Sequence, residues 1–275
     1  MNYNIYKCPV CNQDLNKDVN SYSCSNSHSF DIARDGYLNL LLVNKKKSKL
    51  PGDNQLMIDG RSQFLSLGFY DFLASEIISI LDQQFENQKI TVLDAGCGEG
   101  YYINYIQEKN KDYATHGFDI SKYAAKLASR KNSKTQMAVA SVFDMPYRSE
   151  SLDAIISVFS PISNLEFNRV LKSNGIAIVV TPGSEHLSEI ASLIYEEFKP
   201  HIRESNILES NSFEIIKREN ITKKINLDSN KMINDLLKMT PYYWQVPLSK
   251  KSMFDSIEKI NTTASFQISI FKKLV

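Results

Sequence analysis

The stretch that decides the fold is "ITVLDAGCGEGYYINYIQ", residues 90–107. It reads as an apolar strand, then a glycine-rich turn, then an amphipathic helix. Gly96, Gly98 and Gly100 let the backbone turn tightly and approach a ligand closely, and the start of the helix offers free N–H groups. The G-x-G-x-G spacing is a weak signal by itself, because dinucleotide-binding folds use similar loops. The unit predicts a ligand at the end of a buried strand.

Two carboxylates make this prediction more specific. Asp94 lies at the end of the strand, immediately before the loop, where it can meet a cationic ligand. Asp119 closes a second predicted strand in "THGFDIS", residues 115–121. A carboxylate at that place can bind the two hydroxyls of a ribose. We therefore expect both side chains at the ligand site.

The rest of the sequence alternates between helix and strand patterns. A helical pattern runs from Gln63 to Phe85. Beyond the loop, "KYAAKLASRK" and "LEFNRVLK" are helical, and "QMAVAS", "DAIISVF" and "GIAIVVTP" are apolar strands. This order predicts a doubly wound α/β sheet, with ligands at the carboxyl ends of its strands.

Residues 6–30, "YKCPVCNQDLNKDVNSYSCSNSHSF", indicate a metal site. Cys8 and Cys11 form C-x2-C, and Cys24 and His28 follow as C-x3-H. Three thiolates and one imidazole complete a tetrahedral zinc site with no open position, which makes the predicted site structural. The alternative is a set of reduced cysteines beside a surface histidine. The spacing favours zinc, which would fold a segment too small to be stable alone.

Composition sets outer limits on the function. The chain has 275 residues, of which 43% are apolar and 23% are charged, as in ordinary globular proteins. It has no long apolar run and its N-terminus is polar, so we expect a cytoplasmic protein that does not bind membranes. A formal net charge of +1 argues neither for nor against nucleic acid.

A lysine-rich segment follows the predicted metal site and ends at "PGD". Its cations are Lys45, Lys46, Lys47 and Lys49. Such a run is often a solvated loop, but beside a zinc module it also suits the phosphates of an RNA backbone. Both interpretations stay open.

The order of strand, acidic glycine loop, helix and strand ending in Asp resembles class I S-adenosylmethionine-dependent methyltransferases, which have a Rossmann-like doubly wound sheet. The chain is further similar to the RlmA-type family of 23S ribosomal RNA guanine-N1 methyltransferases. The matching pieces are the cysteine and histidine spacing, "FDIARDGYLNLL", the lysine loop with "PGD", "VLDAGCGEGYY", "TPGSEHL" and "MTPYYW". The resemblance implies three parts: a zinc-binding RNA-recognition module over residues 1–40, a basic loop and connecting helix over 41–88, and a methyltransferase domain over 89–275.

The resemblance also assigns residues. It places the zinc ligands on Cys8, Cys11, Cys24 and His28, and S-adenosylmethionine contacts on Tyr70, Gly98, Glu99 and His186. Together with Asp94, Gly96 and Asp119, these residues form the expected cofactor site. Tyr70 is alternatively a core aromatic, and His186 an ordinary residue at a helix start. The cofactors implied are S-adenosylmethionine and a structural zinc ion.

The implied reaction requires little covalent chemistry from the protein itself. The sulfonium methyl is electrophilic, so the enzyme must align N1 of guanine behind it and help that nitrogen lose its proton. The sequence does not identify the general base. The strand end "VFSPI" lacks the Asn/Asp-Pro-Pro-aromatic tetrapeptide that is used on exocyclic amines, which agrees with methylation of a ring nitrogen.

The expected partner is a hairpin of 23S ribosomal RNA, with no DNA and with a homodimer as an open possibility. Two other functions remain open: a methyltransferase of a small molecule, and a zinc-containing protein that binds RNA without catalysis.

Near the C-terminus, "FEIIKRENITKKINL" and "ASFQISIFKKL" are expected to form an antiparallel strand pair. Between them, Tyr242, Tyr243 and Trp244 form either a core cluster or an aromatic wall near the target base.

Overall fold

A computed structural model describes residues 5–46, 48, 51–86, 88–195, 208 and 212–274. Its strands are β1 (Asn16–Lys17), β2 (Ser21–Ser23), β3 (Ser29–Asp31), β4 (Leu38–Asn39), β5 (Thr91–Ala95), β6 (Ala114–Asp119), β7 (Gln136–Val139), β8 (Leu152–Val158), β9 (Leu171–Pro182), β10 (Phe213–Leu227) and β11 (Ile260–Lys273). Its helices are the 3-10 turn η1 (Val43–Lys45), α1 (Gln55–Leu65), α2 (Asp71–Phe85), α3 (Tyr101–Lys109), α4 (Lys122–Lys131), α5 (Asn164–Val170), α6 (Ser188–Ile194), α7 (Asn230–Lys238), α8 (Tyr242–Gln245) and α9 (Leu248–Ser256).

An eight-stranded sheet organises the described part of the chain, in the order β10-β11-β9-β8-β5-β6-β7-β4. The strands from β4 to β9 are parallel, and β11 and β10 add antiparallel to the β9 edge. After β5 the chain winds toward β7, and it then returns to β8 on the other side of β5. The strand order therefore reverses between β5 and β8, where ligands bind in open α/β sheets. The doubly wound sheet and the antiparallel pair expected from the sequence are confirmed.

The two faces of the sheet carry separate apolar clusters, because successive side chains of a strand point to opposite sides. In β5, Val92 belongs to the cluster that includes α2, α3, α4 and α6, whereas Leu93 and Ala95 belong to the cluster on the other face. Every residue of β5 is buried, as expected for a central parallel strand. The position of the glycine loop is therefore fixed by a fully buried strand.

The segment predicted as one helix from Gln63 to Phe85 forms two helices. α1 begins at Gln55, where the Asn54 side chain accepts a hydrogen bond from the backbone N–H of Met57, and it ends at Leu65. The chain then turns through Gly68, whose φ of +77° suits glycine, before α2 starts. The single-helix prediction is wrong, because a turn of this kind leaves the apolar periodicity almost unbroken.

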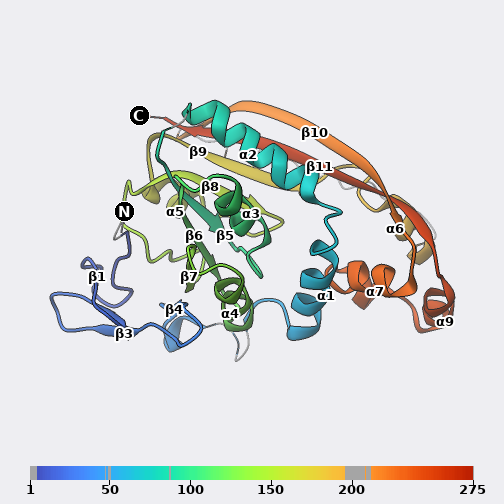
Figure 1. The fold of residues 1–275 in the computed structure, drawn as a ribbon, viewed down its shortest axis with the longest axis horizontal. Coiled ribbons are helices and arrows are strands. Elements are labelled where there is room, and N and C mark those ends of the chain that lie inside the picture. Colours follow the sequence, from blue (N-terminus) through green and yellow to red (C-terminus); the bar gives the residue numbers. More distant parts are fainter. Residues whose placement is uncertain are drawn as a thin grey trace.

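The N-terminal segment packs against the sheet. Its strands β1 to β3 form a small antiparallel sheet, and β4 pairs parallel with β7 at the edge of the large one. The Arg148 backbone N–H donates to the Ile5 carbonyl oxygen (2.8 Å), and the rings of Tyr6 and Tyr147 lie 5.2 Å apart. Figure 1 shows this segment beside β4 and β7, at the opposite end of the molecule from α7 and α9. In the described part of the chain, no helix combines the length and apolarity needed to cross a membrane.

Candidate cofactor pocket and metal centre

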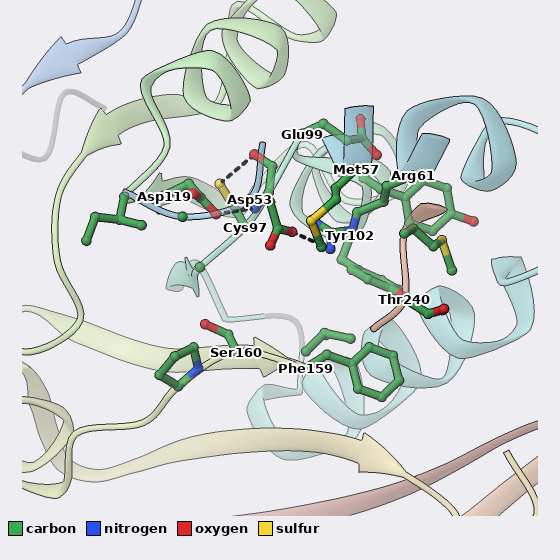
Figure 2. Close-up of a pocket in the computed structure, with 18 of the residues that line it drawn as sticks. Asp53, Met57, Arg61, Cys97, Glu99, Tyr102, Asp119, Phe159, Ser160 and Thr240 are labelled. Carbon is green, nitrogen blue, oxygen red and sulfur yellow. Dashed lines mark hydrogen bonds and ion pairs between the residues drawn. The ribbon is translucent and has the colours of Figure 1, made fainter. Parts of the chain in front are cut away.

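A cavity of about 1000 Å³ opens at the carboxyl ends of β5, β6 and β8, at the reversal of the strand order. It is also walled by α1, by Thr240 and by α8. Figure 2 shows Met57 and Arg61 of α1 and Thr240 around it. All of the residues predicted for the cofactor line it: Tyr70, Asp94, Gly96, Gly98, Glu99, Asp119 and His186. Folding thus brings together side chains that are far apart in the sequence.

The glycine loop has no room for larger residues at its two ends. Gly96 has a φ of +78°, and a Cβ atom there would collide with Ser160 Oγ. Gly100 has a φ of +83°, and a Cβ atom there would lie 2.8 Å from Cβ of Ala128. Both positions combine a left-handed backbone with a close neighbour, so glycine is required on two counts. The loop can therefore lie tightly between β5 and α3 and leave the cavity above it open.

Asp119 holds the glycine loop in place. Its Oδ2 accepts from the Gly98 N–H (2.9 Å), and its Oδ1 accepts from the Ser121 N–H (2.7 Å). Burial raises the pKa of this carboxyl, while the two backbone donors and the nearby Arg61 oppose that rise. Each carboxylate oxygen can accept further hydrogen bonds, so the same group can receive ligand hydroxyls from the cavity.

Asp94 has a different environment. Its Oδ2 is buried and has no hydrogen-bond partner among the described residues. Burial, followed by the charges of Asp119 and Glu99, raises the pKa of Asp94 to about 8. A backbone hydrogen bond from Ile103 opposes this rise only in part. A buried carboxyl with one unpaired oxygen is costly in its charged form, and a cation beside it would remove that cost. The residues present therefore fit a ligand with a cationic centre, such as S-adenosylmethionine.

Glu99 has a partner that the sequence did not reveal. Its Oε2 is ion-paired with Lys131 of α4, although the side chain is only 1% exposed. Its Oε1 has no partner among the described residues. The Glu99 carboxylate therefore already pairs with the Lys131 ammonium group. The ammonium group of a bound ligand would share this carboxylate with Lys131.

Tyr70 and His186 form the wall near β11. Tyr70 is buried at the start of α2, and its ring lies edge-on to Phe266 at 4.9 Å. Its hydroxyl has no partner among the described residues. Nδ1 of His186 accepts from the Ser265 N–H (3.3 Å), which leaves the proton of a neutral ring on Nε2. Each residue is thus both a core residue and part of the cavity wall, so the two interpretations of Tyr70 are compatible.

Several lining residues were missed by the sequence reasoning. Asp53 and Arg61 form an ion pair (2.6 Å), and both residues line the cavity. Phe159 has a left-handed backbone (φ +55°), a strained conformation for a phenylalanine, and it lines the cavity beside Ser160. The motifs "PGD" and "VFSPI" are visible in the sequence, but only the folded chain shows that they line the same cavity as the glycine loop.

The aromatic cluster near the C-terminus is split by the fold. Tyr242 is buried, belongs to the core and lines the cavity. Trp244 is 58% exposed and packs edge-on against Tyr243, with ring centroids 5.1 Å apart. The core interpretation therefore holds for Tyr242, whereas Trp244 faces solvent.

The four predicted metal ligands converge on one point. Ligand atoms of Cys8, Cys11, Cys24 and His28 all lie within 4.8 Å of one another. Nδ1 of His28 is 3.4 Å from Sγ of Cys24 and 3.7 Å from Sγ of Cys8, and Sγ of Cys11 is 3.6 Å from Sγ of Cys24. Two sulfur ligands about 2.3 Å from a tetrahedral zinc ion lie about 3.8 Å apart, so the spacing fits zinc.

The lysine segment is described only in part. Lys45 is ion-paired with Asp144, in the loop between β7 and β8, and Lys46 is exposed. Lys47 and Lys49 lie outside the described residues. At least one of the four cations thus has a partner within the protein.

The sheet, the glycine loop and the zinc-ligand cluster define a class I S-adenosylmethionine-dependent methyltransferase with a zinc ribbon. Residues 6–49 match the family described as "RlmA, N-terminal", and residues 93–179 match "Methyltransferase domain". The cofactors are accordingly S-adenosylmethionine and zinc.

Three similar proteins are matched over two thirds or more of this chain. YxjB of Bacillus subtilis (strain 168), provisionally named a 23S rRNA (guanine-N1) methyltransferase, is 29% identical and is matched over 99% of both chains. The 23S rRNA (guanine(748)-N1) methyltransferase of Streptomyces fradiae is 29% identical, over 86% of this chain and 85% of that one. A protein of Micromonospora griseorubida, with the same provisional name as YxjB, is 30% identical, over 67% of this chain and 68% of that one. The chain belongs to the family of 23S rRNA (guanine-N1) methyltransferases, which confirms the resemblance drawn from its motifs.

Proposed function

We propose that this chain transfers a methyl group from S-adenosylmethionine to N1 of a guanine in a hairpin of 23S ribosomal RNA. One observation carries the proposal. A closed zinc ribbon and a methyltransferase cavity occur in one chain, and a relative named for this reaction matches 99% of it. A methyltransferase of small molecules would leave the ribbon without a role.

The seven predicted cavity residues are the proposed cofactor site. Asp119 receives the ribose hydroxyls while it holds the Gly98 N–H. Asp94 and Glu99 face the cationic part of the ligand, and Gly96 and Gly98 allow it to lie close to the backbone. Tyr70 and His186 close the wall opposite the loop. The buried, partnerless Oδ2 of Asp94 is the feature that most favours a cation at this place, among the residues that the structure describes.

When bound, S-adenosylmethionine supplies an electrophilic methyl group on a sulfonium centre. The protein then has to hold the acceptor nitrogen in line with that methyl and keep water out. The apolar side chains of Phe159 and Tyr242 line the remaining part of the cavity and suit a flat base. We assign no residue as the group that removes the N1 proton.

N1 of a guanine is paired in a duplex, so the target must be a loop base or an extruded base. We propose that the zinc ribbon presents a rigid surface to the RNA around that base. We also propose that the protein acts in the cytoplasm and on RNA, not DNA. The homodimer stays a prediction that light scattering would check.

A transfer assay tests the proposal. The protein is incubated with S-adenosylmethionine labelled in its methyl group and with unmodified 23S RNA, 16S RNA or transfer RNA. We expect label in 23S RNA alone, and after digestion we expect it in 1-methylguanosine. Label on another nucleoside or another RNA would contradict the proposal. Absence of label in every RNA, with methylation of a small molecule, would support the alternative enzyme class.

A further inference from the structure

The cavity lining has an uneven charge distribution. Four carboxyl side chains line it: Asp53, Asp94, Glu99 and Asp119. Among the described lining residues, Arg61 is the only lysine or arginine. A ligand that carries both cations and a carboxylate would find many partners for its cations but a single cationic partner for its carboxylate.

Arg61 lies where it can reach a ligand on the glycine loop. It projects from α1, and its Nη2 binds Oδ2 of Asp53 (2.6 Å). Its Nη1 lies 3.3 Å from the place that a Cβ atom of Gly98 would take. Figure 2 shows the Arg61 side chain entering the cavity beside Asp53. The guanidinium is held by one edge and lies next to the loop, and its five N–H donors exceed what Asp53 alone can accept.

The segment that carries this ion pair is docked on the ribose side of the site. Gly52 has a φ of +85°, and a Cβ atom there would lie 2.9 Å from Ile120 and 3.2 Å from Ser121. Ser121 in turn donates its backbone N–H to Asp119. The contacts of Gly52 therefore connect the segment that carries Arg61 to the residues that follow Asp119. Arg61 and Asp119 each lie next to Gly98 of the glycine loop.

We propose that Arg61 binds the carboxylate of the amino-acid part of S-adenosylmethionine. This inference rests on the proposed function, since it needs that cofactor in the cavity. With the ribose at Asp119, the amino-acid part would lie within reach of Arg61 if it followed the glycine loop. A carboxylate there, close to four acidic side chains, would be costly to bury without a cationic donor. A guanidinium supplies two parallel hydrogen bonds to such a group.

The test compares S-adenosylmethionine with its decarboxylated form. The two ligands share the nucleoside, sulfonium and ammonium and differ only in the carboxylate. In calorimetry, Arg61→Ala should weaken binding of S-adenosylmethionine by about 10- to 100-fold, the usual range when a charge-assisted hydrogen-bond pair is removed. The same variant should not weaken binding of the decarboxylated form. The ratio of the two changes in affinity, one for each ligand, isolates the interaction between Arg61 and the ligand carboxylate.

Two variants separate this role from a structural one. Arg130→Ala removes a comparable ion pair, between Arg130 and Asp35 (2.6 Å), away from the cavity, and should change neither affinity. Asp53→Asn breaks the same ion pair as Arg61→Ala but keeps the Arg61 guanidinium. It should therefore not weaken binding of S-adenosylmethionine more than binding of the decarboxylated form. Equal weakening of both ligands by Arg61→Ala, or a selective loss in Asp53→Asn that matches it, would overturn the inference.

The outcome also distinguishes the inference from the proposed function. If the wild-type protein bound no S-adenosylmethionine, both would be wrong. If the wild-type protein bound the cofactor and methylated 23S RNA, while Arg61→Ala weakened binding of both ligands equally, only the inference about Arg61 would be wrong.

Discussion

At the scale of single residues, Asp94 and Asp119 both follow buried strands, but their surroundings differ. Asp119 has two backbone N–H donors, whereas Oδ2 of Asp94 has no partner among the described residues. The carboxylate of Asp119 is thus stabilised by hydrogen bonds, while burial keeps Asp94 protonated up to a pKa of about 8. The two acids are suited to different parts of one ligand.

The raised pKa of Asp94 predicts a pH dependence of stability. Between about pH 4 and about pH 8 the folded protein holds a proton on this carboxyl that the unfolded chain releases, since the pKa rises from 3.8 to about 8 on folding. The contribution of Asp94 to stability is therefore complete below pH 4 and is lost as the pH rises. Asp94→Asn, which cannot ionise, should become more stable relative to wild type across this range.

Thermal unfolding of the ligand-free protein checks this. The difference in Tm between Asp94→Asn and wild type should move in favour of the variant from pH 5 to pH 8. Glu108→Gln, an exposed carboxyl on α3, is the control and should show no such trend. A constant difference for Asp94→Asn would mean that the carboxyl is not destabilised in its charged form.

Substitution of the two acids that contact the loop should weaken binding of the cofactor. Asp119→Ala removes the proposed ribose acceptor and the brace of the Gly98 N–H, so we expect about 10- to 100-fold weaker binding of S-adenosylmethionine. Glu99→Ala should also weaken binding, by less, because Lys131 already shares that carboxylate. Calorimetry on folded variants measures both, with Glu108→Ala as the control. Wild-type affinity in both variants would remove these residues from the cofactor site.

At the residue scale, the sequence indicated which side chains line the cavity best where the pattern is local; their roles toward the cofactor stay predictions. Asp94, Asp119 and the glycines lie within one strand–helix–strand unit of the chain, and all of them line the cavity except Gly100, which immediately precedes α3. The Lys131 partner of Glu99 could not be foreseen, because α4 approaches α3 only in the folded sheet. Arg61 was missed for the same reason, since α1 reaches the glycine loop through tertiary packing alone.

At the scale of elements, strands were the most predictable. Apolar runs bounded by turn residues identified β5 to β9, because buried strands of a parallel sheet are almost continuously apolar. The antiparallel strands β10 and β11 were identified by residues that favour β-structure, although β10 is largely exposed. β4 escaped notice as a strand, because its two residues pair with β7, far along the chain. The break between α1 and α2 escaped notice because the apolar pattern crosses it.

The zinc ribbon gives a prediction that separates RNA methylation from cofactor binding. Its metal holds a segment with little core of its own, so Cys24→Ser should unfold the region between the contacts at Ile5 and β4. The large sheet has its own core, so cofactor affinity should stay close to wild type. Methylation of 23S RNA should be largely abolished.

Hydrogen exchange, metal analysis and the transfer assay together check this prediction. Ser25→Ala, an exposed neighbour of Cys24, is the matched control and should behave as wild type. Normal RNA methylation by Cys24→Ser, after verified loss of the metal, would show that the ribbon is dispensable.

The lysine segment gives a second prediction at this scale. If Lys45, Lys46, Lys47 and Lys49 bind phosphates, their replacement by Ala should weaken RNA binding and flatten its dependence on salt. Removal of each lysine–phosphate interaction should reduce the log–log slope by about one unit. Lys45 should contribute least, since Asp144 already pairs with it.

Filter binding over a range of salt concentrations measures this slope. Alanine at the exposed lysines Lys89, Lys109 and Lys111 removes a similar charge elsewhere and is the control. A slope equal to that of the wild type would make the segment a solvated connector.

At the scale of the whole molecule, one sheet supports both proposed tasks. The cavity lies at the carboxyl ends of β5, β6 and β8, and the zinc ribbon packs beside β7 through β4 and the contacts of Ile5 and Tyr6. Helices α7 and α9 lie at the other end of the molecule from the ribbon (Figure 1). We expect the RNA to contact the ribbon while its target base enters the cavity.

The central claim is that ribbon and cavity act together on one guanine of 23S RNA. The most direct measurement is reverse transcription of 23S RNA that lacks the modification, after incubation with the protein and S-adenosylmethionine. Methylation of N1 blocks Watson–Crick pairing, so we predict one new stop, at a guanine in a hairpin. The stop should be much weaker with Asp119→Ala at a limiting concentration of S-adenosylmethionine, and largely abolished with Cys24→Ser. No new stop with active wild-type protein, or an undiminished stop with either variant, would contradict the account.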